Sequence, residues 1–73
     1  PVTNIRFTLA EEQSVSLTVY NLSGQLVQTL VDGKKIAGTH SIQWNASSSA
    51  SGVYFYRLQA GDRSVTQKMI LVK

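Results

Sequence analysis

The 73-residue sequence contains no cysteine, one proline, one histidine and only four acidic residues. Without cysteine the chain can form no disulfide, no thiolate nucleophile and no cysteine-ligated zinc site. It has no apolar run long enough to span a bilayer, and it does not begin with a signal peptide. What remains is 42% hydrophobic residues, a share typical of one folded domain rather than of a disordered chain.

The charge of the chain is modestly basic, with a formal net charge of +3. Its seven basic residues are scattered, and only Lys34 and Lys35 are adjacent. A nucleic-acid site normally gathers its cations into a patch or stripe. The sequence therefore predicts no nucleic-acid partner.

Catalytic and metal-binding combinations are also missing from the sequence. Catalysis needs a nucleophile, a base and an orienting group that converge. The adjacent Glu11 and Glu12 fall in a predicted loop, Asp32 and Asp62 fall in predicted turns, and His40 falls near the end of a predicted strand. We therefore expect no catalytic residue, no metal site, no cofactor and no enzymatic activity.

Apolar side chains recur with the period of two that half-buried strands require. Turn chemistry separates these segments at Asn21–Gly24, Asp32-Gly33 and Gly61-Asp62. No window shows a helical period, and short strands spaced ~8–12 residues apart are typical of an all-β sandwich. The predicted antiparallel strands are 3–9, 15–20, 25–31, 39–45, 51–58 and 64–72.

The run 51–58 is the densest in β-forming residues and is predicted to be the central strand. Alternation places Tyr54, Tyr56 and Leu58 on its core face and Val53, Phe55 and Arg57 on the other. Both faces are largely apolar, so this strand is either covered on both sides or flanked by neighbours with large side chains. The last strand has the same property and is predicted to be covered on both faces.

Two further features concern single strands. The parity of Val27 and Leu30 differs, which predicts a β-bulge that buries both side chains, with one unpaired residue between them. Trp44, together with Tyr54 and Tyr56, could form a flat platform for sugars or the core of the sandwich. Because Trp44 alternates with Ile42 on an apolar face, the core is favoured.

The order of these features resembles one known family, the type IX (Por) secretion system C-terminal sorting domain, type A. The flagellar hook-cap Ig-like domain has a related pattern. The resemblance covers the whole chain, which ends at Lys73, shortly after a Lys-Met segment, as domains of that family do. It is carried in order by Val19-Tyr20-Asn21, Gly24-Gln25, Val27, Leu30, Gly38, Trp44, the run 51–58 and Lys68-Met69-Ile70-Leu71.

The resemblance implies an Ig-like sandwich of about seven strands, without catalysis of its own. It implies that residues 1–73 are a single C-terminal domain of a larger secreted protein, and a start at Pro1 agrees with this. The implied partners are a cargo domain on the N-terminal side, the outer-membrane translocon and a sortase-like peptidase. The implied route leads through the periplasm to the cell surface or the medium of Bacteroidetes-like bacteria.

We therefore expect a non-catalytic sorting domain that targets its cargo to the type IX translocon. Because Lys68 and Lys73 bracket the apolar run 69–72 of the last strand, we expect the translocon to recognise Lys68, Met69 and Lys73. We also expect Met69 and Ile70 to help hold the sandwich together. An alternative is a structural or glycan-binding Ig-like accessory module of an extracellular enzyme or hook-cap-like protein. A parent protein with a signal peptide and this domain at its C-terminus would favour sorting.

Overall fold

The computed structural model describes residues 2–72, which form six β-strands and no helix. The all-β prediction is confirmed, and each predicted strand is present with ends shifted by a few residues. The six strands are close to the expected count of about seven, and every connection between them has six residues or fewer. The strands are β1 (Val2–Leu9), β2 (Gln13–Asn21), β3 (Leu26–Lys35), β4 (Gly38–Asn45), β5 (Gly52–Ala60) and β6 (Arg63–Leu71).

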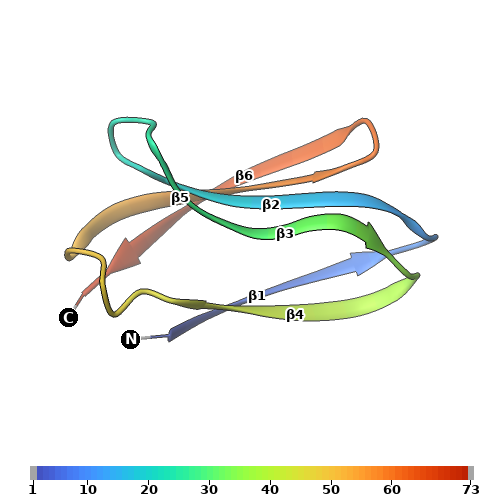
Figure 1. The fold of residues 1–73 in the computed structure, drawn as a ribbon, viewed down its shortest axis with the longest axis horizontal. Helices are drawn as coiled ribbons and strands as arrows, with labels where there is room; N and C mark the ends of the chain where they lie inside the picture. The colour runs from blue at the N-terminus through green and yellow to red at the C-terminus, as the bar shows by residue number, and fades with distance from the viewer. Residues whose placement is uncertain (1, 73) are drawn as a thin grey trace.

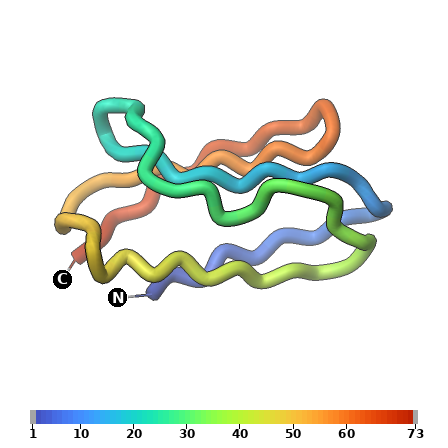
Figure 2. The backbone as a smooth tube through the Cα atoms, viewed as in Figure 1, coloured from blue at the N-terminus to red at the C-terminus, as the bar shows by residue number. Residues whose placement is uncertain are grey.

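The strands form two antiparallel sheets that pack face to face as an Ig-like sandwich (Figure 1). One sheet pairs β1 with β4, and the other has the order β3-β2-β5-β6. Figure 2 shows that the start of β1, the end of β6 and the connections 22–25 and 46–51 lie together, and we call this the terminal end. The connections 10–12, 36–37 and 61–62 lie at the opposite end, the loop end (Figure 1).

The core lies between the sheets in two adjoining clusters. Trp44 is 1% exposed, and its ring meets that of Tyr54 edge-to-face at 5.2 Å. The Tyr54 hydroxyl donates a hydrogen bond to the Ala50 carbonyl oxygen at 2.7 Å, which satisfies its polar end. Tyr56 is half-buried and packs against both clusters. The core interpretation of these aromatic residues is confirmed, and Trp44 forms no exposed platform.

Strand β3 contains two β-bulges where the sequence predicted one. The pairing with β2 skips Leu30 between Val31 and Thr29, and it skips Val27 between Gln28 and Leu26. The skipped residues are thus the two apolar ones themselves, not a residue between them. Leu30 is half-buried, but Val27 is 38% exposed, so the prediction that both are buried is wrong for Val27. As the bulges lie on an edge strand, only one neighbour constrains where Val27 points.

The turn predictions hold at two of three places. Asn21 Oδ1 accepts hydrogen bonds from the backbone N–H groups of Ser23 and Gln25, and Gly24 takes φ +83°. Gly61 takes φ +62° in a two-residue loop that joins β5 to β6. The predicted turn at Asp32-Gly33 is wrong, because Asp32 and Gly33 continue the ladder opposite Ser16 and Val15. A tight hairpin there would keep the chain in one sheet, whereas β3 continues and crosses to β4 in the other.

Candidate functional site

One surface of the four-stranded sheet faces away from β1 and β4, and we call it the outer face. Leu26, Tyr20, Phe55 and Lys68 are successive cross-strand partners along one row from β3 to β6. Directly opposed residues in antiparallel strands project to the same side of the sheet. The four side chains therefore lie next to one another on the outer face.

Apolar side chains gather at the terminal end of this face. Val53 and Ile70 form the cross-strand pair two residues beyond Phe55 and Lys68, on the same side of the sheet. Ile70 is 67% exposed and Leu26 is 58% exposed, whereas the other three are half-buried. We call this set the apolar patch. Its members are Tyr20, Leu26, Val53, Phe55 and Ile70.

Polar groups border the apolar patch and hold part of it in place. The Thr18 hydroxyl donates to the Tyr20 hydroxyl oxygen at 3.3 Å, which directs the Tyr20 ring along the surface of the sheet. Arg57, two residues from Phe55 on β5, donates through Nε to Ser64 Oγ at 3.2 Å. Arg57 and Lys68 are both exposed, so two cations stand beside the aromatic side chains.

The outer face of the two-stranded sheet has a different composition. Its cross-strand pairs include Asn4 with Gln43, and Arg6 with Ser41. Thr8 and Thr39 follow, with their hydroxyl oxygens 3.1 Å apart. All of these residues are exposed. This face is the polar, solvated surface that an antiparallel sheet normally presents to water.

Two of the three residues predicted for translocon recognition, Lys68 and Met69, are described, and they lie at different depths. Lys68 is exposed on the outer face, beside Phe55. Met69 is half-buried on the opposite side of β6 and packs against both core clusters, so it holds β6 in the sandwich. Lys73 lies outside the described residues. Sequence reasoning assigned no role to Tyr20 or Leu26; the outward parity of Tyr20 indicated its position, but that of Leu26 depends on the bulges.

The prediction that β6 is covered on both faces is wrong. On its core side Leu71 is buried, but Val65 is 49% exposed. On its outer side Ile70 is exposed and contributes little to holding the sandwich together. Val65 is exposed because the opposing sheet has only two strands, whereas β6 is the edge of a sheet of four. Ile70 is exposed because no strand of residues 2–72 packs outside the four-stranded sheet. For β5, the large side chains on neighbouring strands account for its second apolar face.

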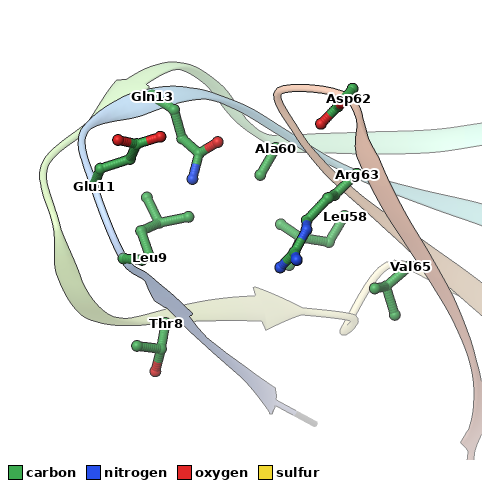
Figure 3. Close-up of a pocket in the computed structure, with 10 residues that line it drawn as sticks. Thr8, Leu9, Glu11, Gln13, Leu58, Ala60, Asp62, Arg63 and Val65 are labelled. Atoms are coloured by element: carbon green, nitrogen blue, oxygen red, sulfur yellow. The ribbon is translucent and has the colours of Figure 1, made fainter.

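A shallow cleft of about 610 Å³ opens at the loop end, between β1 and the β5–β6 hairpin. Leu9 and Leu58 lie on opposite walls, with Glu11 and Arg63 at the rim (Figure 3). The lining includes no histidine, cysteine or serine. Its hydroxyl and acidic groups are Thr8, Glu11 and Asp62, and the Thr8 hydroxyl oxygen lies 3.1 Å from that of Thr39.

The other candidate chemical groups have structural partners or lie in water. His40 Nε2 donates to the Ile36 carbonyl oxygen at 2.8 Å, and its ring stacks on Phe7 at 5.3 Å. Glu11 and Glu12 are exposed in the β1–β2 loop. Within residues 2–72, no three side chains of the metal-binding types come together, and no helix could cross a membrane.

Comparison with known proteins gives one match. The model of the family described as "Secretion system C-terminal sorting domain" matches residues 1–73. No curated protein and no solved structure matches the chain. The match covers the apolar patch as well as the core.

Proposed function

Because the chain belongs to the family of secretion system C-terminal sorting domains, we propose that it directs a cargo protein to the type IX translocon for export or surface attachment. Domains of this family act as type IX sorting signals, are typical of Bacteroidetes, and lead to the cell surface or the extracellular space. The match over all 73 residues carries the proposal.

In this proposal residues 1–73 are one C-terminal domain of a larger secreted protein, with the cargo on the N-terminal side. The cargo crosses the periplasm, the outer-membrane translocon reads the domain, and a sortase-like peptidase removes it. The domain performs no chemistry itself. Its family is non-catalytic in general.

We place translocon recognition on the last strand, at Lys68, Met69 and Lys73. Strand β6 is an edge of the four-stranded sheet, so its outer backbone groups are available to a partner. Lys68 adds an accessible charge at this edge. Met69 packs against both core clusters and so holds β6 in position, and it contributes in this way rather than by contacting the translocon itself.

The test is a fusion of this domain, preceded by its native linker, to a periplasmic reporter in a host with a type IX system. We expect the reporter outside the cell. Lys68→Ala combined with Lys73→Ala is expected to leave it in the periplasm. Exposed charges usually change stability by less than about 0.5 kcal/mol, so the melting temperature is expected to stay unchanged. Arg6→Ala, on the solvent-facing side of the two-stranded sheet, is the matched control and is expected to leave export intact.

The second candidate is a structural or glycan-binding accessory module. The half-exposed rings of Tyr20 and Phe55 favour it, because aromatic faces stack on sugars. The same experiment separates the two functions. If the intact fusion stays in the periplasm of a competent host, sorting is wrong and the accessory module replaces it.

A further inference from the structure

The apolar patch lies on a sheet face that is normally polar in an antiparallel sheet. One face of such a sheet packs on the core and the other is polar, as on the two-stranded sheet. Here β5 carries Val53 and Phe55 on the solvent side and β6 carries Ile70, and Leu26 and Ile70 are more than half exposed within residues 2–72. Contiguous apolar surface on a small domain marks a contact site.

We propose that the apolar patch, with Lys68 and Arg57 beside it, docks a protein surface that presents apolar side chains next to carboxylates. The proposal rests on the proposed function, in which that protein is a component of the translocon. The apolar patch then contacts the translocon together with Lys68, the charged residue that the proposed function already assigns to recognition. Recognition then involves a sheet surface as well as a sheet edge.

The charge distribution determines the acidic character of the partner. Glu11, Glu12 and Asp62 lie in the loop-end connections, and Asp32 lies opposite Ser16 toward that same end. No acidic residue occurs in β5 or in the part of β6 beside the patch, which carries Lys68. Lys34, Lys35 and Arg63 offset the acidic residues at the loop end, whereas Lys68 and Arg57 have no carboxylate beside them. A partner with carboxylates is therefore attracted to the apolar patch, and a basic partner is repelled.

The same distribution disfavours a second copy of the chain as the occupant. A two-fold dimer through the patch would bring each copy of the surface against itself. Such a dimer would bring Lys68 and Arg57 of both copies into one contact, where neither copy supplies a carboxylate to pair them. Such like-charge contacts oppose association.

The side chains of the patch favour protein over sugar. Leu26, Val53 and Ile70 carry no hydrogen-bonding group, whereas sugar hydroxyls need polar partners beside the stacking ring. Tyr20 and Phe55 are cross-strand neighbours, and Tyr20 is also held by Thr18. Rings ordered in advance lose little conformational freedom on binding, which is why aromatic residues dominate protein contacts.

The test uses the reporter fusion with two matched pairs of variants. Ile70→Glu on the patch is compared with Val2→Glu, since both residues are exposed and apolar, at 67% and 55%. Lys68→Glu is compared with Arg6→Glu on the polar outer face. We expect each patch variant to lower the exported fraction roughly tenfold or more, because the new carboxylate meets apolar side chains at position 70 and carboxylates of the partner at position 68. The controls are expected to match the unchanged fusion, and all variants are expected to keep their melting temperature.

The outcomes separate this proposal from the proposed function. If the unchanged fusion is exported and both patch variants are exported equally well, sorting stands and the docking surface is wrong. If the unchanged fusion is not exported, both fall. If sedimentation shows a dimer of the chain that Ile70→Glu dissociates, a second copy is the occupant and the proposal is overturned. Retention of the isolated domain on surface polysaccharide, lost in Phe55→Ser while export persists, overturns it in favour of a glycan.

Discussion

On the outer face of the two-stranded sheet, Asn4 lies opposite Gln43 and Thr8 opposite Thr39, whereas on the outer face of the four-stranded sheet Tyr20 lies between Leu26 and Phe55. Both sheets contribute to the same core. The strict alternation of β1 and β4 shows that one apolar face is enough to fold a strand into this sandwich. The outward Val53 and Phe55 of β5 and Ile70 of β6 are therefore not needed for this alternation, and they form part of the surface that we propose for docking.

The largest loss of stability is expected from changes in the core, because both sheets pack on the same residues there. Trp44 and Tyr54 join the sheets, with ring centroids 5.2 Å apart. Trp44→Ala or Tyr54→Ala is expected to cost about 3–5 kcal/mol of unfolding free energy, because a large buried ring leaves a cavity. That loss is comparable with the whole stability of a small domain. Urea unfolding followed by circular dichroism measures it, and an unchanged midpoint would show that the core is misplaced.

A smaller and one-sided effect is expected at the β5–β6 hairpin. Gly61 has φ +62°, and a Cβ there would lie 3.1 Å from Gln13 Oε1. Gly61→Ala is expected to cost about 1–2 kcal/mol, because a side chain disfavours the left-handed conformation. Amide hydrogen exchange is expected to rise in β5 and β6 more than in β1 and β4. If amide exchange rose equally in both sheets, the hairpin would not stabilise the four-stranded sheet independently of the two-stranded sheet.

The smallest change in stability is expected from substitutions on the two solvent-facing surfaces, one on each sheet, and these compare the surfaces most directly. Ile70→Thr and Val2→Thr each replace an exposed apolar side chain with a polar one of strand-forming type. Both are expected to change unfolding free energy by less than about 0.5 kcal/mol. Denaturant midpoints measure this difference. If Ile70→Thr alone destabilised the domain by several times that amount, the apolar patch would be part of the fold rather than a contact surface.

The sequence was informative wherever one face of a strand is buried. Ile5, Phe7 and Leu9 alternate with polar residues, and this pattern alone located β1 and its core side. Turn chemistry at Asn21 and Gly61 fixed two connections, because a particular side-chain bond or positive φ is needed there.

Predictions were wrong where the result depended on the number of strands that oppose one another. Two apolar faces on β6 were interpreted as two covered faces, but Ile70 is exposed because no strand of residues 2–72 packs outside the four-stranded sheet. The position of Leu26 beside Tyr20 depends on two bulges whose exact register no local pattern specifies. The apolar patch therefore required the pairing of strands that are distant in sequence.

The most direct test of the docking surface is photocrosslinking during export. Benzoylphenylalanine is incorporated in place of Ile70 on the patch or in place of Gln43 on the polar outer face, within the exported fusion. The account predicts a crosslink from position 70 to a translocon subunit, identified by mass spectrometry, and none from position 43. Equal crosslinking from both positions, or a crosslink from position 43 alone, would contradict it.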